Sequence, residues 1–338
     1  MEIEFESISE ALPGPKWQAL FERHWPAYQK WFLSEGDAER TSYLASVRQL
    51  RAHMPELLPT YERLVELAGG GDAAARFLSL YRPPPYLSGC SQAVWLGDAP
   101  FLVRNYDYSP RLCEGTVLCS QWNGRKVMAM VDCLWGAVDG MNDSGLVVSL
   151  TFGGRRVVGD GFGVPVILRY ILETCGTTAE AEAVLMRVPT HMSYNVTVLD
   201  RFGNFRTAFL SPDRRPEIRP LPMATNHQGK VEWHAHARAT ASLEREQYLF
   251  FRLADSEETG EGLIDSFHRP PLFSTGYQKG FGTLYTTVYW PLSGVMELRW
   301  PGQSWFLSFD NFEEGVRTIR YDSGFGKLRG GLYILADI

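Results

Sequence analysis

The sequence predicts an α+β fold in which two stacked β-sheets are covered by helices and preceded by a helical N-terminal segment. Two observations carry this prediction. Apolar residues recur at helical spacing through the first 88 residues, and after Cys90 the period changes toward two, as expected of strands. Beyond that point, strands, helices, strands, helices and closing strands follow one another in blocks.

The N-terminal segment contains four predicted helices. Large apolar residues at positions 17, 20, 21, 25, 28 and 32 mark the first, although Pro26 should kink or split it. The second covers about 44–51 and stops before Pro55, and the third covers about 57–67 and ends at the glycines 69–71. Asp72 then caps a short helix over 73–80.

A rigid connector, Pro83-Pro84-Pro85, lies a few residues before Gly89-Cys90 and marks the best boundary in the chain. A triple proline favours extended backbone and cannot continue a helix. We therefore expect residues 1–89 to form a helical segment and residues 90–338 to form the main domain.

The main domain is expected to consist of short strands and two pairs of helices. The first strands are predicted at 93–95, 101–103, 116–118, 127–131 and, after the turn sequence Asn142-Asp143-Ser144-Gly145, at 146–150. Helices at 164–172 and 178–188 precede strands at 194–199, 205–210 and the run into 224–227. Helices at about 243–254 and 261–267 precede closing strands at 283–290, 294–300 and 305–309.

Composition indicates an ordinary globular protein. Apolar residues make up 45% of the chain and charged residues 21%, and the net charge of -6 disfavours a nucleic-acid or anionic-membrane partner. The acidic N-terminus lacks a signal peptide, and no apolar run approaches the roughly 18 residues of a membrane span. We therefore expect a soluble, cytoplasmic protein. Five cysteines without a Cys-x-x-Cys pair predict neither a disulfide framework nor a structural zinc site.

Cys90 opens one predicted strand, and Arg104 and Asp107 lie on the next, so a hairpin would bring a thiol, a guanidinium and a carboxylate together. A cysteine attacks a carbonyl as its thiolate, and Arg104 could lower the thiol pKa or fix Asp107. Asp107 could in turn orient an amine. Cutting the Gly89–Cys90 bond would supply one, with a typical pKa of about 7.7–8.0 that suits proton transfer. The alternative is that Cys90 is a small buried apolar residue.

Several short motifs follow the order found in one group of enzymes. They are Ser88-Gly89-Cys90-Ser91, Phe101-Leu102-Val103-Arg104-Asn105-Tyr106-Asp107-Tyr108, Gly140-Met141-Asn142-Asp143-Ser144-Gly145-Leu146, Ala224-Thr225-Asn226-His227, Ser242-Leu243-Glu244-Arg245 and Thr283-Leu284-Tyr285-Thr286-Thr287-Val288. Together they resemble the isopenicillin N acyltransferase family and the wider choloylglycine hydrolase-like and acid-ceramidase-like amidases, which are N-terminal-nucleophile (Ntn) hydrolases. The resemblance runs from about residue 88 to 300; each motif is weak alone, and the ordered set is fairly specific.

The resemblance implies a four-layer αββα Ntn-hydrolase sandwich and self-cleavage before Cys90, which makes residues 1–89 a propeptide-like segment. It also implies action on the linear amide C–N bond of a small acyl-amide substrate, by hydrolysis or acyl transfer through a Cys90 thioester.

The same resemblance assigns roles to five residues. Cys90 is the nucleophile and its freed amine the base, Arg104 and Asp107 orient that pair, Asn226 donates to the oxyanion and Arg245 supports the site. Bile-salt hydrolases have an asparagine just beyond the Gly-Leu hairpin, where this chain has Thr151-Phe152. A backbone N–H is therefore expected in place of that second donor.

Two alternatives use the same sequence differently. Cys90 and His227 would form the dyad of a hydrolase that works uncut, or the chain would keep the fold as a non-catalytic binding protein. His234 and His236 lack an evident third metal ligand, so a solvated loop is favoured there. The glycines at 324, 326, 330 and 331 are too irregular for a dinucleotide fingerprint, so neither a metal nor a cofactor is expected.

Overall fold

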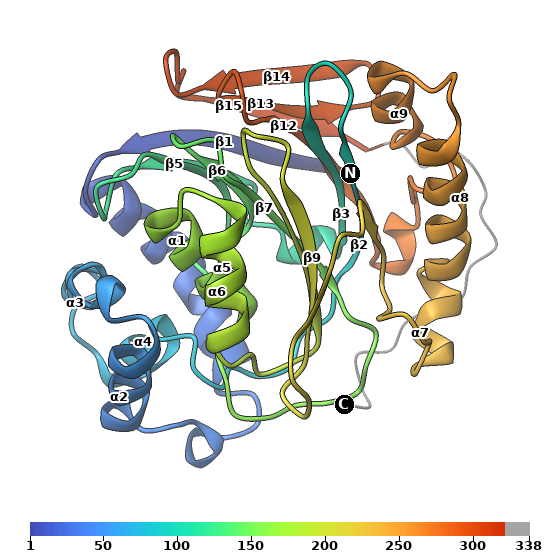
Figure 1. The fold of residues 1–338 in the computed structure, drawn as a ribbon. Helices are drawn as coiled ribbons and strands as arrows, with labels where there is room; N and C mark the ends of the chain where they lie inside the picture. The colour runs from blue at the N-terminus through green and yellow to red at the C-terminus, as the bar shows by residue number, and fades with distance from the viewer. Residues whose placement is uncertain (322–338) are drawn as a thin grey trace.

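Two β-sheets lie face to face in the computed structural model, which describes residues 1–321 (Figure 1). The strand order of the larger sheet is β10-β9-β8-β7-β6-β5-β4-β1-β15, and that of the smaller sheet is β11-β2-β3-β12-β13-β14. Strands β2 and β7 contact each other across the interface between the sheets. The side chain of Gln92 crosses this interface, donating to Thr197 Oγ1 at 2.7 Å and accepting from Ser149 Oγ at 2.6 Å.

The larger sheet collects strands from almost the whole chain. Its members are β1 (Glu2–Glu10), β4 (Thr116–Ser120), β5 (Val127–Asp132), β6 (Gly136–Asn142), β7 (Val147–Phe152), β8 (Tyr194–Leu199), β9 (Phe205–Leu210), β10 (Glu217–Arg219) and β15 (Gly315–Arg320). The smaller sheet contains β2 (Gly89–Trp95), β3 (Phe101–Tyr108), β11 (Met223–Ala224), β12 (Gly282–Trp290), β13 (Val295–Trp300) and β14 (Gln303–Ser308).

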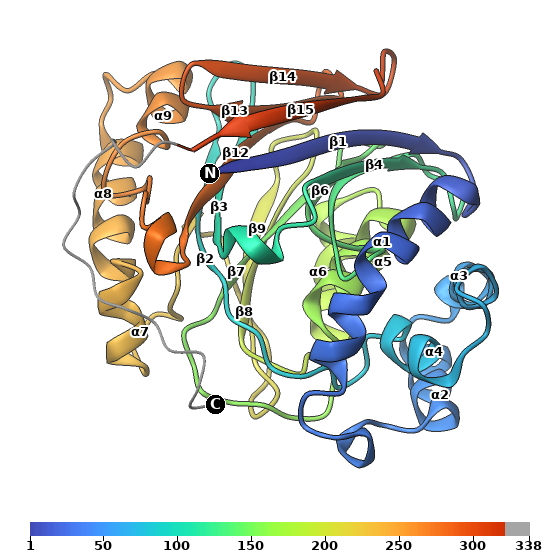
Figure 2. The same ribbon diagram turned by 180° about the vertical axis from the view of Figure 1, so that it is seen from behind.

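Helices cover the outer faces of both sheets. Helices α5 (Val164–Thr174) and α6 (Thr178–Arg187) pack on the larger sheet, whereas α7 (His234–Ala239), α8 (Ser242–Ala254) and α9 (Gly260–Ser266) lie on the side of the smaller one (Figures 1 and 2). The layer order is helix, sheet, sheet, helix, which confirms the predicted αββα sandwich.

Four α-helices precede strand β2: α1 (Pro15–Phe32), α2 (Tyr43–His53), α3 (Leu58–Leu67) and α4 (Asp72–Leu78). All four were predicted, but α1 runs through Pro26 as one helix instead of splitting there. Pro26 lies on an exposed face, where water can bond the carbonyl that the missing N–H leaves free. Trp17, Phe21 and Phe32 anchor both ends of α1 in the core.

The prediction of a purely helical N-terminal segment misses strand β1. This strand lies inside the larger sheet, parallel to β4 and antiparallel to β15. Its sequence alternates glutamate with apolar or small residues, and Phe5 is fully buried on the inward face. Residues 1–10 therefore form part of the same sheet as residues far along the chain.

Other differences are local. Strands β6, β10 and β15 were not predicted, and the expected loop at His234 is the helix α7. The glycines at 324–331 lie outside the described residues. Within residues 1–321, none of the helices is long and apolar enough to cross a membrane.

Candidate active site

Cys90 lies in the second position of β2, opposite Tyr106 of the antiparallel strand β3. Its side chain is fully buried in the space between the sheets. Arg104, two residues before Tyr106 on the same face of β3, donates from Nη2 to Cys90 Sγ at 3.2 Å. The structure therefore brings the predicted thiol and guanidinium into direct contact.

The position of Arg104 is set mainly by an acid that the sequence analysis did not identify. Its guanidinium forms an ion pair with Asp139 of β6, and both side chains are fully buried. Its Nε donates to the Leu150 carbonyl at 3.1 Å, and its guanidinium lies 4.7 Å from the centre of the Tyr106 ring. A lone aspartate in the apolar run Val138–Met141 was the available signal, because a buried carboxylate needs a partner.

The pKa of the Cys90 thiol lies above its usual value in the uncut chain. Burial raises its pKa, and Arg104 and the Asp107 backbone N–H only partly offset this. Arg104 does favour a lower thiol pKa, as expected. The pKa is nevertheless raised overall, because the loss of solvent around the buried sulfur disfavours the thiolate more than Arg104 favours it.

Asp107 lies on the opposite face of β3 from Arg104, toward helix α8. Its carboxylate pairs with Arg245 of that helix and accepts from Thr283 Oγ1 at 2.6 Å. Arg245 also donates from Nε to the Pro271 carbonyl at 2.9 Å and from Nη1 to Ser91 Oγ at 3.4 Å. The predicted Asp107 and Arg245 thus form one buried ion pair behind the strand that carries Cys90.

Asn226 binds the backbone atom that a cut at residue 89 would turn into an amine. The Cys90 N–H donates to Asn226 Oδ1 at 3.1 Å, while Asn226 Nδ2 makes a long 3.4 Å contact with the Phe152 carbonyl. The Asn226 N–H is fixed by Ser242 Oγ at 2.8 Å. In the uncut chain this side chain therefore acts as an acceptor for Cys90.

Gly89 lies directly against the ring of Phe281. A Cβ at this position would lie 2.3 Å from Cζ of the Phe281 ring, far inside ordinary contact distance. Gly89 is the register partner of Asp107, so the peptide bond to Cys90 runs directly along the site. A side chain on the residue before Cys90 would therefore displace this ring.

His227 faces away from the sulfur. Its Nδ1 lies 2.8 Å from Ser242 Oγ and its Nε2 lies 3.1 Å from Glu246 Oε2, so both ring nitrogens contact residues of α8. Through Ser242 this histidine supports the backbone of Asn226. No group of three or more potential metal ligands occurs within residues 1–321, and this includes the surroundings of His234 and His236.

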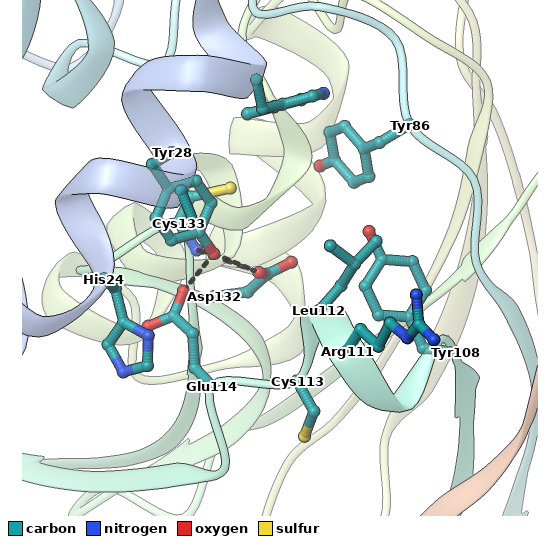
Figure 3. Close-up of a pocket in the computed structure, with 12 residues that line it drawn as sticks. His24, Tyr28, Tyr86, Tyr108, Arg111, Leu112, Cys113, Glu114, Asp132 and Cys133 are labelled. Atoms are coloured by element: carbon teal, nitrogen blue, oxygen red, sulfur yellow. Dashed lines mark hydrogen bonds between the residues drawn. The ribbon is translucent and has the colours of Figure 1, made fainter. Parts of the chain in front are cut away.

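A cavity of about 150 Å³ lies between the N-terminal segment and the main domain (Figure 3). Its wall begins at Tyr108, whose ring centre is 5.4 Å from that of Tyr106, the register partner of Cys90. Helix α1 contributes His24, Ala27, Tyr28 and Trp31 to the opposite side. No local sequence pattern predicts this cavity, because its walls come from segments far apart in the chain.

The sequence profile of a family described as acyl-coenzyme A:6-aminopenicillanic acid acyl-transferase matches residues 95–305. The match covers more than half of the chain and includes Arg104, Asp107, Asn226 and Arg245, whereas Cys90 lies just before it. No curated protein sequence matches the chain.

Solved structures similar to this chain include a hydrolase, an acylase and an amidase. A mutant conjugated bile acid hydrolase from Clostridium perfringens shares 12% identity over 69% of this chain and 97% of its own, with a TM-score of 0.43. Penicillin V acylase from Agrobacterium tumefaciens shares 12% identity over 68% of this chain and 90% of its own, with a TM-score of 0.46. The N-acylethanolamine-hydrolyzing acid amidase ortholog of Caenorhabditis elegans shares 16% identity over 68% of this chain and 100% of its own, with a TM-score of 0.45.

Proposed function

Because the chain belongs to the acyl-coenzyme A:6-aminopenicillanic acid acyl-transferase family, we propose that it is a self-processing cysteine hydrolase or acyltransferase that acts on linear amide C–N bonds. One observation carries the proposal: Cys90 is held at both reacting atoms, its sulfur by Arg104 and its nitrogen by Asn226. A cysteine that is merely a buried apolar residue needs neither contact.

The proposed maturation step moves the Gly89 acyl group from nitrogen to sulfur. Cys90 Sγ attacks the Gly89 carbonyl carbon, the C–N bond breaks, and the thiol proton ends on the released nitrogen. Water then hydrolyses the Gly89 thioester, leaving a carboxylate on Gly89 and a free thiol and amine on Cys90. Asn226 Oδ1 already accepts from this nitrogen, so it would hold the new amine close to its original place.

The freed amine supplies the general base that the uncut chain lacks. A terminal amine has a pKa of about 7.7–8.0, near the value that favours proton transfer at neutral pH. It accepts the thiol proton as Sγ attacks the substrate carbonyl, then returns it to the leaving amine. The resulting thioester is resolved by water in hydrolysis or by a second amine in acyl transfer.

Arg104, Asp107 and Arg245 position this pair. Arg104 holds the sulfur and favours its thiolate, while the Asp107–Arg245 pair keeps charge fixed behind the strand. Asn226 Nδ2 is the proposed oxyanion donor, because its only described partner is the long contact to Phe152. A single donor of this kind contributes about 2.7–4 kcal/mol to transition-state stabilisation. A dyad with His227 is not part of the proposal, since both of its ring nitrogens contact α8.

Residues 1–89 are proposed to stay bound after the cut as a separate subunit. Strand β1 is hydrogen-bonded to β4 on one side and β15 on the other, and Trp17 donates from Nε1 to the Leu134 carbonyl at 3.0 Å. Losing this segment would expose two strand edges and a large apolar surface.

The test is the intact mass of the purified protein. The 38.2 kDa chain should give pieces of about 10 and about 28 kDa, in proportion to residues 1–89 and 90–338, and they should elute together under native conditions. Cys90→Ala should remain uncut, and the matched control Cys119→Ala should be cut as the wild type is. Cleavage of Cys90→Ala at the same bond would mean that Cys90 is not the nucleophile.

Activity is tested by released amine from a panel of N-acyl amino acids, penicillins, bile-salt conjugates and N-acylethanolamines. The proposal expects thiol-dependent turnover of at least one class by the processed protein. Full-length protein with no such activity would favour the non-catalytic binding protein instead.

A further inference from the structure

We propose that the cavity beside Tyr108 binds a cationic alkylammonium group of the substrate, so that the enzyme acts on amides carrying such a group. This inference rests on the proposed amidase function for its substrate, although the binding site itself can be tested without turnover. The cavity is lined by aromatic rings and by two carboxyl groups, those of Glu114 and Asp132 (Figure 3).

The base of the cavity contains two carboxyl groups with an unsatisfied acceptor. Tyr28 donates its hydroxyl hydrogen bond to Glu114 Oε1 and lies 3.1 Å from Asp132 Oδ1. The Leu134 N–H donates to the same Glu114 oxygen at 3.1 Å, and the Cys133 N–H to the same Asp132 oxygen at 3.0 Å. Glu114 Oε2 is buried without a hydrogen-bond partner in the described part of the chain. A buried acceptor of this kind favours a ligand that brings a donor or a positive charge.

The turn between β5 and β6, which follows Asp132 and donates to both carboxyls, has a strained backbone. Cys133 and Leu134 are consecutive non-glycine residues with φ of 57° and 72°, in the left-handed region that costs such residues energy. This conformation points both of their N–H groups at the two acids. Strain of this kind persists at sites where the geometry is needed, which is consistent with a ligand site.

Aromatic rings supply the second element of cation binding. Tyr28, Trp31, Tyr86 and Tyr108 all line the cavity, and the faces of such rings attract ammonium groups. A volume of about 150 Å³ is comparable to that of a cavity that accommodates one benzene ring. The space therefore fits an ammonium with a few carbon atoms rather than a long acyl chain.

The basic groups at the cavity do not cancel its acidity. His24 lines it, but burial and the neighbouring Arg23 lower the His24 pKa, so the ring is uncharged near neutral pH. Arg111 also lines the cavity, on an exposed turn rather than beside the carboxyls. Burial raises the pKa of Glu114 to about 8 and that of Asp132 to about 6, so Asp132 is the more acidic of the two and is the first to become negatively charged as the pH rises.

The position of the cavity defines the substrate class further. Cys90 and Tyr106 are register partners, and Tyr108 follows two residues later on the same face of β3. Two residues along a strand span about 7 Å. A substrate that reaches Cys90 would therefore carry its ammonium group at least roughly 7 Å from the scissile amide.

The first experiment measures binding to the uncut Cys90→Ala protein. Choline and its neutral carbon isostere 3,3-dimethylbutan-1-ol are titrated by calorimetry and by tryptophan fluorescence, which Trp31 can report. We expect choline to bind at least 10-fold more tightly at pH 9, where both carboxyls have lost their protons, and Glu114→Gln or Asp132→Asn to reduce that preference. Glu244→Gln, an exposed acid on α8, is the matched control and should retain it. Equal binding of the two probes, or no binding of choline, would overturn the proposal.

A second measurement does not depend on whether those variants fold. Choline carries a charge that does not titrate, so its affinity for the Cys90→Ala protein should rise as the pH increases through about 8 and Glu114 loses its proton. An affinity that stays flat or falls between pH 6 and 9 would contradict the assignment.

The activity arm separates this inference from the proposed function. N-acyl amides with a terminal trimethylammonium group are compared with the tert-butyl isosteres, and the ammonium substrates should have at least a 10-fold higher kcat/KM. Choline binding without any amide turnover would end the proposed function and leave the cation site standing. Equal turnover of both series, without choline binding, would retain the amidase and exclude the cation site.

Discussion

The Cys90 site and the cavity are connected through Tyr106, whose ring neighbours both Arg104 and Tyr108, and the two regions balance charge in opposite ways. In the site, Arg104 meets Asp139, and Arg245 meets Asp107. In the cavity, two acidic side chains meet each other, and within residues 1–321 neither has an ion pair with a basic side chain. The buried charges of the Cys90 site are therefore paired with opposite charges, whereas the carboxyls of the cavity are not.

The difference indicates what each region is built to do. Paired buried charges fix the positions of their side chains, because separating them would leave an ion without solvent or partner. Glu114 and Asp132 instead hold a proton that they can release, because burial and their mutual repulsion favour the protonated form of Glu114. The Cys90 site is therefore suited to holding side chains in fixed positions, and the cavity to releasing a proton when a cationic ligand binds.

The largest effect is expected from breaking the charge balance of the site. Asp139→Asn leaves the Arg104 guanidinium buried without a counter-charge and should lower the free energy of unfolding by about 3–5 kcal/mol. Urea denaturation of the uncut Cys90→Ala protein measures this. The exposed pair between Arg320 and Glu2 is the control, and Glu2→Gln should change stability by less than about 1 kcal/mol. Equal effects of the two variants would contradict the proposed role of Asp139.

The next effect concerns the packing around the Gly89–Cys90 bond. Gly89→Ala places a Cβ against the Phe281 ring and should destabilise the chain by about 1–3 kcal/mol. Its cleavage should also slow, because the Gly89 carbonyl must shift relative to Cys90 Sγ. Adding Phe281→Leu should recover part of both losses. Cleavage of Gly89→Ala at the wild-type rate would show that this close packing does not position the carbonyl.

The acid pair of the cavity predicts a pH dependence of stability. The Glu114 pKa is raised from about 4.5 to about 8, so the folded chain binds more protons than the unfolded chain between these values. Its stabilising contribution is therefore complete below about pH 4.5 and is lost as the pH rises through 8. Glu114→Gln should be more stable than the wild type at pH 9 by at least about 1 kcal/mol, with a smaller difference at pH 5. Urea midpoints that show the same difference at both pH values would contradict this.

Sequence periodicity predicted the layers of the fold because most strands and helices have one buried face. It missed β1, whose alternation of Glu2, Glu4 and Glu6 with buried neighbours resembles an acidic terminus until its partners are known. The motifs predicted that Cys90 and Arg104 lie together. They did not predict that the thiol pKa is raised, because burial depends on the whole fold.

The other features that the sequence could not predict depend on contacts between residues far apart in the chain. His227 stands beside Asn226 in the sequence, but its ring contacts Ser242 and Glu246, which lie four residues apart on one face of α8. The cavity depends on helix α1 meeting the β5–β6 turn, a contact between residues about a hundred positions apart. No local sequence pattern predicts such a long-range contact.

The smallest effect is expected from the hydroxyl that links the two acids. Tyr28→Phe removes one donor while leaving the ring in the cavity wall, and should lower the free energy of unfolding by about 1 kcal/mol at pH 7. The Tyr28 hydrogen bond lowers the Glu114 pKa, so its loss should raise that pKa further and move the pH-dependent loss of stability to higher pH. Choline should still bind, because the ring and both carboxyls remain. If Tyr28→Phe abolished choline binding as fully as Glu114→Gln, the hydroxyl rather than the negative charge would be the recognised feature, and the contrast between a charge-balanced site and an acidic cavity would fail.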